Sequence, residues 1–187
     1  MTKLTTYFLL CLFPFAQAIA TDTEQLKQNS RAAAKALGGE LKGVLQASMK
    51  ASGPVKSLSV CRDSAPAIAS KVSASKGLEV GRTSLKYRNA NNKPDAWETA
   101  VLEKFEQRKA MGEAADKLEF SEVTEHNGNK VFRYMKAIPT GDVCLKCHGS
   151  NIAEPIKAEL DKLYPGDRAR DFSKGDIRGA FTVIHPL

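Results

Sequence analysis

Hydrophobic residues recur at helical spacing in the first part of the chain. Between residues 22 and 50, leucine, alanine, valine and methionine return every three or four positions, with charged residues between them. This pattern predicts an amphipathic helix. The stretch ASGPVK at 51–56 ends it, and Pro54 is typical of the start of a second helix, which carries Cys61. A third helical stretch follows and runs through Val72, so the N-terminal region is predicted to be helical.

From Leu78 onward, short alternation of apolar and polar residues replaces the helical spacing. LEVGRTSLKYRN (78–89) predicts a strand. After a loop, Asp95 is a plausible N-cap for a helix over 96–111. Residues 118–138 alternate on both sides of an Asn-Gly pair, which is the strongest short signal for a β-hairpin.

The last part of the chain predicts one more helix and a closing strand. The helix covers 152–163, with Pro155 in its first turn, and the strand covers 177–187. Helices first, and then an antiparallel sheet with a helix inserted, indicate the α+β fold class.

The first twenty residues, MTKLTTYFLLCLFPFAQAIA, have the pattern of a secretory signal peptide. Lys3 precedes an apolar run, and small residues end at Ala20. The run is shorter than the roughly 20 residues that a bilayer span needs. We expect cleavage after Ala20, with cleavage after Ala18 and an uncleaved anchor as alternatives. A single domain over 21–187 is then delivered to the periplasm, with no membrane span.

The chain has a formal charge of +7 at pH 7, and its basic residues are spread along the sequence. No aromatic stacking platform accompanies them, so we predict no nucleic-acid partner. An acidic redox partner, an anionic surface and plain solubility all agree with this charge.

The segment GDVCLKCHGS (141–150) contains the C-x-x-C-H pattern of covalent c-type haem attachment. In a helical turn, Cys144 and Cys147 lie on one side, where both thiols can reach the two vinyl groups of a porphyrin. His148 then lies under the ring and can bind the iron. A zinc site usually takes two such pairs, and a redox disulfide usually lies at the strand–helix junction of a βαβ unit. The pattern therefore favours one covalently attached haem c over both.

The second axial ligand is left open by the residues alone. Cys61 lies among small and apolar residues, where a buried thiol could simply be core. Coordination would protect it from oxidation, and a thiolate would lower the iron's potential. The candidates are Cys61, Met49, Met111, Met135, His126, His185 and water.

Four stretches together resemble a family of periplasmic, single-haem, c-type, PAS-like domains. They are SVCRDSAPAIA (59–69), GRTSLKYRNANNKPDAWE (81–98), YMKAIPTGDVCLKCHG (134–149) and GDIRGAFTV (175–183). The resemblance implies a PAS-like antiparallel sheet behind an N-terminal helical region, and iron ligated by His148 and Cys61. One departure is Ala90, where proline is expected after Arg-Asn; it concerns the loop and not the ligands.

Three side chains in the second stretch are candidates to bind the haem propionates. They are Arg82, Tyr87 and Arg88, because guanidinium pairs well with carboxylate. The alternative is an ordinary solvated strand edge.

The function predicted from these features is a periplasmic redox or gas sensor that uses a Cys/His-ligated iron. Such a protein would signal through a separate partner protein and could take a diatomic gas as ligand. The alternative is a small monohaem electron carrier that exchanges electrons with a redox partner protein. An enzyme would need an open iron site and a distal acid–base group. Nothing in the sequence places His126 or His185 there, so we do not predict an enzyme.

Overall fold

The computed structural model describes residues 15–187, with side chains from residue 22 onward. Helix α1 (Phe15–Lys56) is the first described element. Residues 1–14 of the predicted signal peptide therefore lie outside the described residues. Within residues 15–187, no helix combines the length and the apolar character that a membrane span requires.

The N-terminal region is helical, as predicted, but its second helix is shorter than expected. Helix α1 is kinked at Gly53, whose φ is 75°, and ends just after Pro54 at Lys56. Cys61 lies in η1 (Val60–Ser64), a single π-helical turn in which the Ala65 N–H bonds to the carbonyl of Val60. The widened turn fits the neighbouring Pro66, because a proline has no N–H and its ring clashes with the carbonyl four residues earlier. Helix α2 (Ala65–Lys76) follows directly.

Four strands form one antiparallel sheet in the order β1-β4-β3-β2. They are β1 (Glu79–Thr83), β2 (Glu119–His126), β3 (Asn129–Pro139) and β4 (Ile177–Pro186). The predicted hairpin is confirmed: Asn127 and Gly128 have positive φ of 52° and 78°, as a type I′ turn requires. The closing strand β4 lies between β1 and β3, so the two central strands come from distant parts of the chain.

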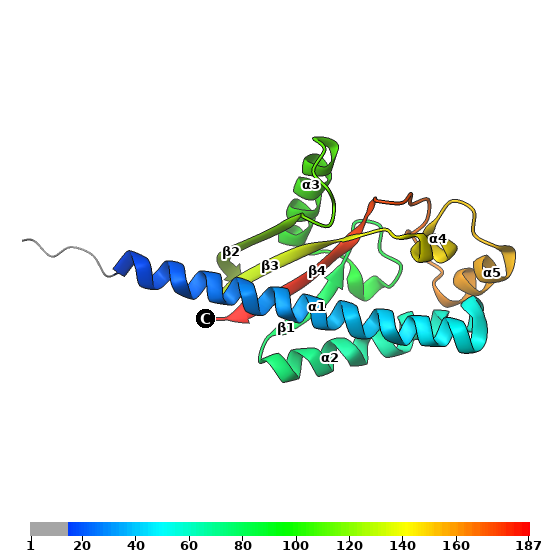
Figure 1. The fold of residues 1–187 in the computed structure, drawn as a ribbon, viewed down its shortest axis with the longest axis horizontal. Coiled ribbons are helices and arrows are strands. Elements are labelled where there is room, and N and C mark those ends of the chain that lie inside the picture. The colour runs from blue at the N-terminus through cyan, green and yellow to red at the C-terminus, as the bar shows by residue number, and fades with distance from the viewer. Residues whose placement is uncertain (1–14) are drawn as a thin grey trace, which may run out of the picture.

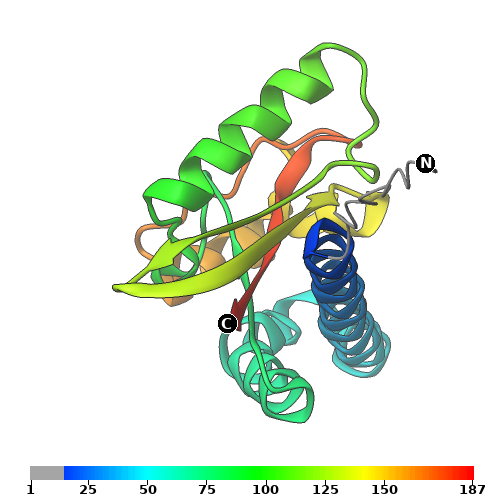
Figure 2. The same ribbon diagram turned by 90° about the vertical axis from the view of Figure 1, so that its left-hand side faces the viewer.

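Helices cover both faces of the sheet. Figure 1 and Figure 2 show α1 and α2 on one side and α3 (Ala96–Ala110) on the other. The core under α1 and α2 includes Leu37, Phe132 and Val183. A second core under α3 includes Phe105 and Met135. The α+β class with an N-terminal helical region is thereby confirmed.

The second of the four stretches that carry the family resemblance, residues 81–98, holds α3 on the sheet. Asp95 caps α3 in a capping box with Glu98, as the sequence predicted for its N-cap. Arg133, on β3, is almost fully buried and lies 2.8 Å from Asp95 Oδ2 and 3.4 Å from Glu98 Oε1. Its guanidinium also stacks 4.1 Å from the ring of Trp97. This part of the stretch is therefore structural.

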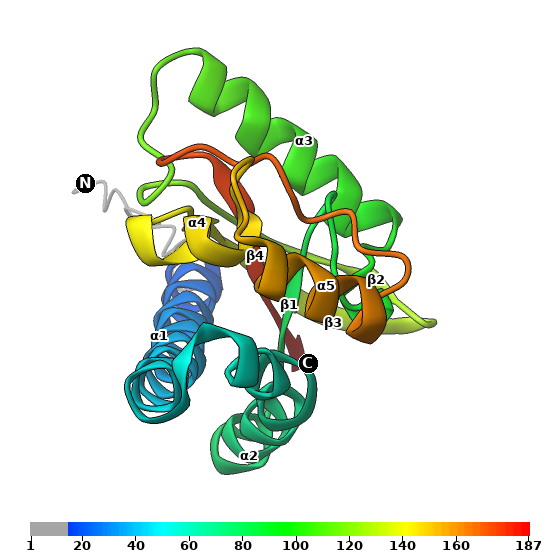
Figure 3. The ribbon, with the colours of Figure 1, turned by 90° about the vertical axis from the view of Figure 1, so that its right-hand side faces the viewer.

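Two short helices lie beside the end of the sheet, above the C-terminal end of α1 (Figure 3). They are α4 (Asp142–His148), which contains the C-x-x-C-H segment, and α5 (Glu154–Leu163). Helix α5 packs through Ile156 and Leu160 on Leu58, which lies between α1 and η1. The end of the sheet, α4 and the Cys61 turn are thus brought together.

Candidate functional site

The C-x-x-C-H segment is a short helix with glycine at both ends. Gly141 precedes α4 in an extended conformation, and its carbonyl accepts a hydrogen bond from the Cys144 N–H at 2.9 Å. Gly149 follows His148 and closes the helix by donating to the Leu145 carbonyl at 3.0 Å. A Cβ at position 149 would lie only 2.7 Å from that carbonyl oxygen. Glycine is therefore required directly after the histidine by close approach of the backbone.

The His148 imidazole is oriented by a backbone carbonyl. Nδ1 lies 2.8 Å from the Ala169 carbonyl oxygen, and since a carbonyl only accepts, Nδ1 must carry the proton. Burial lowers the pKa of His148 well below its ordinary value, and the nearby Arg178 and Arg88 add to this effect. The imidazole is therefore neutral, and Nε2 keeps its lone pair, which is the state that binds a metal.

All seven residues predicted for the site line one cavity of about 390 Å³. Cys144, Cys147 and His148 come from α4, whereas Cys61 comes from η1 in the helical region. The polar side chains Arg82, Tyr87 and Arg88 come from β1 and the loop after it. Its apolar wall includes residues of α1 such as Leu41 and Leu45. The fold therefore assembles thiols, an imidazole and guanidinium groups from distant segments around one space.

The cavity wall is cationic, since none of its lining residues among those the structure describes is acidic. Arg82 has no hydrogen bond or ion pair within residues 22–187, and burial lowers its pKa. Arg178, at the start of β4, is held by Ser84 Oγ at 3.2 Å and the Lys86 carbonyl at 3.3 Å. Burial, together with Arg88 and Arg82, lowers the pKa of Arg178 to about 10. Buried cations without carboxylates are unfavourable alone, so the site suits an anion.

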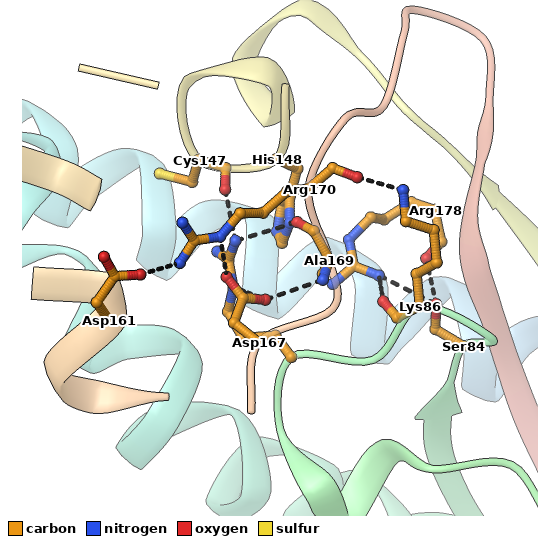
Figure 4. A network of polar contacts seen from close by, with 10 residues as sticks. Ser84, Lys86, Cys147, His148, Asp161, Asp167, Ala169, Arg170 and Arg178 are labelled. Atoms are coloured by element: carbon orange, nitrogen blue, oxygen red, sulfur yellow. Dashed lines mark hydrogen bonds and ion pairs between the residues drawn. The ribbon is translucent and has the colours of Figure 1, made fainter. Parts of the chain in front are cut away.

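Arg88 differs from these two arginines because a buried carboxylate, that of Asp167, is its partner. Its Nε lies 3.0 Å from Oδ1 of Asp167, and its Nη2 donates to the carbonyl oxygens of Cys147 and Ala169 at 2.5 and 3.1 Å. Figure 4 shows the polar contacts around Cys147, Asp167 and Ala169, between α4 and the segment before β4. Burial alone would raise the pKa of Asp167, but hydrogen bonds from Arg88 and the Ala169 N–H outweigh it, so the pKa is lowered. Arg88 thus ties α4 to the carbonyl that orients His148.

Tyr87 lines the cavity, and its backbone carbonyl accepts a hydrogen bond from the Arg168 N–H at 3.1 Å. The Arg168 guanidinium lies 5.6 Å from the Tyr87 ring centroid. Tyr87 therefore joins the loop after β1 to the same segment that Arg88 holds.

The three cysteines and their neighbours were also considered as a disulfide or a zinc site. Cys61, Cys144 and Cys147 are all free thiols, and burial raises the pKa of the Cys147 thiol. Among the described residues, no three histidine, cysteine or acidic side chains are grouped closely enough to hold a metal ion.

Sequence reasoning missed Arg178 and Asp167. Arg178 is the one charged side chain in the otherwise apolar stretch IRGAFTVI, and a charge inside a core strand is a signal that could have singled it out. Asp167 lies in a polar loop, where nothing local distinguishes it from solvated aspartates. Its role depends on a partner 79 positions away along the chain.

Comparison with known proteins gives one family and one similar structure. A family model for Tll0287-like proteins matches residues 15–186. The crystal structure of the cyanobacterial heme-protein Tll0287 superposes with a TM-score of 0.57 at 23% sequence identity, over 93% of this chain and 98% of that chain. At that identity the superposition shows a shared fold. Among curated proteins, no match is found.

Proposed function

The chain belongs to the Tll0287-like family, and on that premise we propose that it is a periplasmic haem c protein that senses redox state or a diatomic gas. The family match covers nearly the whole chain, as the resemblance of the four sequence stretches predicted. In this proposal Cys144 and Cys147 hold the haem covalently, and His148 and Cys61 hold the iron. The similar crystal structure is that of a haem protein, which supports haem binding in this proposal.

One observation carries the proposal: the C-x-x-C-H helix and Cys61 line the same cavity, although 83 positions separate Cys61 from Cys144. The donor set suits a haem c: Cys144 and Cys147 would hold it covalently, and His148 and Cys61 would hold the iron. Leu41 and Leu45 give the apolar wall that a flat ring requires. The acid-free wall with Arg82 and Arg178 suits its two carboxylates.

The chain's own residues would then perform four tasks. His148 presents Nε2 because its Nδ1–H is held by the Ala169 carbonyl. Arg82 and Arg178 neutralise carboxylates, while Arg88 positions α4. Cys61 supplies a thiolate, which favours the oxidised iron and lowers its potential. A bound haem would supply one-electron redox chemistry and an iron that can take a diatomic ligand.

A sensor of this kind changes its iron ligand on reduction, and the change reaches a partner. Cys61 lies in a π-helical turn between α1 and α2, and such turns are frequent at functional sites. Loss of the thiolate from the iron would release that turn from the cavity. A separate signalling or redox partner protein would read the movement of the helical region. We propose a sensor and not an enzyme, because within residues 22–187 neither His126 nor His185 lines the cavity.

The test is absorption spectroscopy of the protein made in a host that attaches haem c. We expect covalent haem and a thiolate-ligated ferric spectrum that Cys61→Ala abolishes. Cys144→Ser and Cys147→Ser should weaken covalent attachment, whereas Cys61→Ala should leave it intact. Ligand exchange on reduction would support the sensor, and an unchanged ligand set in both oxidation states would favour an electron carrier. A protein without covalent haem would refute both.

A further inference from the structure

The cavity is lined by one more sulfur side chain, Met49, to which the proposed function gives no role. Helix α1 presents Leu41, Leu45 and Met49 to the cavity, four positions apart and therefore on one helix face. Met49 is the last of this row and lies nearest in sequence to the turn that carries Cys61. The wall that supplies the sixth iron ligand therefore offers two kinds of sulfur, a thiol and a thioether.

The segments that carry Met49 and Cys61 are tied together. The helix kink at Gly53 turns the chain back, and Ser57 Oγ lies 3.0 Å from Ser48 Oγ and 2.7 Å from the Gly53 carbonyl oxygen. Ser48 is the neighbour of Met49, and Ser57 is one turn before Cys61. Ser57 is also almost fully buried. The turn of α1 that carries Met49 is thus hydrogen-bonded to the segment that leads into the Cys61 turn.

The other candidates for the sixth ligand lie elsewhere. Met111 is 78% exposed at the end of α3, and Met135 is fully buried under α3. His126 lies at the β-hairpin turn and contacts Asn127. His185 Nε2 lies 2.9 Å from the buried Ser30 Oγ. None of these four lines the cavity, so Met49 is the one that shares it with Cys61.

The two sulfurs suit different oxidation states. A thiolate is anionic and donates electron density, so it favours ferric iron and lowers the potential. A thioether is neutral and soft, and as an axial ligand it raises the potential, which means that it favours ferrous iron. A cavity that offers both can therefore exchange one for the other when the iron changes charge.

We propose that Met49 is the iron ligand of the reduced protein and replaces Cys61 there. The inference rests on the proposed haem function. One electron from a redox protein, or from dithionite in vitro, reduces the iron. The Cys61 Sγ–iron bond breaks, the sulfur takes one proton from solvent to become a thiol, and the Met49 Sδ–iron bond forms. Reoxidation reverses the electron, the proton and both bonds.

This exchange defines what the sensor would report. In the oxidised protein η1 is attached to the iron, and in the reduced protein α1 is attached instead. A diatomic ligand such as CO must displace Met49, and not enter an open position. Redox state is then the primary signal, and gas binding follows from it.

The experiment compares the wild type with Met49→Leu, a volume-conserving change, and uses Met111→Leu as the matched control outside the cavity. All three should share the thiolate-ligated ferric spectrum. Reduced wild type and Met111→Leu should be six-coordinate and low-spin. Reduced Met49→Leu should be five-coordinate and high-spin. It should also bind CO roughly tenfold faster or more, because the position above the iron is no longer occupied.

A second comparison uses the oxidised Cys61→Ala protein. Met49 should then bind the ferric iron and give the charge-transfer band of a methionine–iron bond. The double variant Cys61→Ala, Met49→Leu should lack this band. This comparison uses only the ferric spectra of the two variants, so it does not depend on the reduced state.

The outcomes separate this inference from its premise. Equal ferrous spectra and CO rates for wild type and Met49→Leu would overturn the exchange while leaving Cys61 as the ferric ligand. A methionine band in the oxidised wild type that Met49→Leu removes would show Met49 bound in both states, and would overturn both the exchange and the Cys61 assignment. A protein without covalent haem would overturn the proposed function itself.

Discussion

The Nε of Arg88 lies 3.0 Å from the Oδ1 of Asp167, and both side chains are almost completely buried, at 6% and 2% exposure. Asp167 also accepts hydrogen bonds from the Ala169 N–H and from Arg170 Nε, each at 2.9 Å. Ala169 supplies the carbonyl that orients His148. This buried pair therefore supports the imidazole indirectly, through Ala169. A buried ion pair thus supports the candidate site. Arg88 lines the cavity, whereas Asp167 does not.

Asp167→Asn should destabilise the protein by about 3–5 kcal/mol, because it leaves the Arg88 guanidinium buried without its counter-charge. The measurement is urea unfolding of the haem-free and haem-loaded proteins. Asp161→Asn is the matched control, since Asp161 also pairs with Arg170 but is 47% exposed. Its effect on stability should be small, because solvent screens this exposed pair. Equal losses for the two variants would contradict a special role for the buried pair.

Gly149→Ala should distort the end of α4. The added Cβ meets the Leu145 carbonyl oxygen at 2.7 Å, and such overpacking costs about 1–3 kcal/mol. We expect lower thermal stability and less covalent haem per protein, measured by the absorbance ratio of purified protein. Gly141→Ala at the other end of α4 meets nothing within 4 Å and is the control. If both variants load haem equally, the close approach at Gly149 is not needed for attachment.

Arg82→Gln should have opposite effects on the haem-free and the haem-loaded protein. Without haem, the change removes a buried cation that has no acidic partner among residues 22–187, so the unfolding free energy should stay equal or rise. With haem, a carboxylate loses its cation, and the midpoint potential should fall by roughly 40–90 mV, equivalent to about 1–2 kcal/mol.

Arg178→Gln should lower the potential in the same direction, whereas the exposed Arg168 provides a control whose Arg168→Gln variant should leave the potential near that of the wild type. Redox titration with a bound-haem readout measures all three. An unchanged potential in both Arg82→Gln and Arg178→Gln would argue that these side chains do not face the carboxylates.

The stability of the α1–sheet contact should depend on acid pH through Glu119. Hydrogen bonding from Arg31 outweighs burial, Tyr134 adds a further hydrogen bond, and the pKa of Glu119 falls to about 2. The folded-state pKa is below the unfolded value, so the stabilisation is present above about pH 4.5 and is lost as the pH falls towards 2. Urea unfolding across this range measures it.

Glu119→Gln should flatten this part of the pH profile, because glutamine cannot ionise. The difference from wild type should be largest near neutral pH and vanish near pH 2. Glu125→Gln, on the same strand but exposed, should leave the profile unchanged. A wild-type profile that is already flat between pH 5 and about pH 2 would contradict the role assigned to Glu119.

Local chemistry alone determined the elements whose signals are contained in a few residues. The hairpin follows from Asn127-Gly128, since this pair adopts positive φ at little cost. The start of α3 follows from the Asp95 cap and its partner Glu98. The helical turn of α4 was expected from the spacing of Cys144, Cys147 and His148. In each case the deciding contacts join residues that are close in sequence.

Only the tertiary structure decided which distant groups share the cavity. The strand order places β4 between β1 and β3, and this brings Arg178 beside Arg82, a relationship that no local pattern encodes. The tie between Ser48 and Ser57 joins the end of α1, which carries Met49, to the segment before Cys61, and the sequence left both sulfurs among seven candidate ligands. The physical reason is that burial and charge pairing depend on contacts between segments far apart in the chain. Such contacts form only when the sheet and its helices pack, and residue spacing along the chain does not specify them.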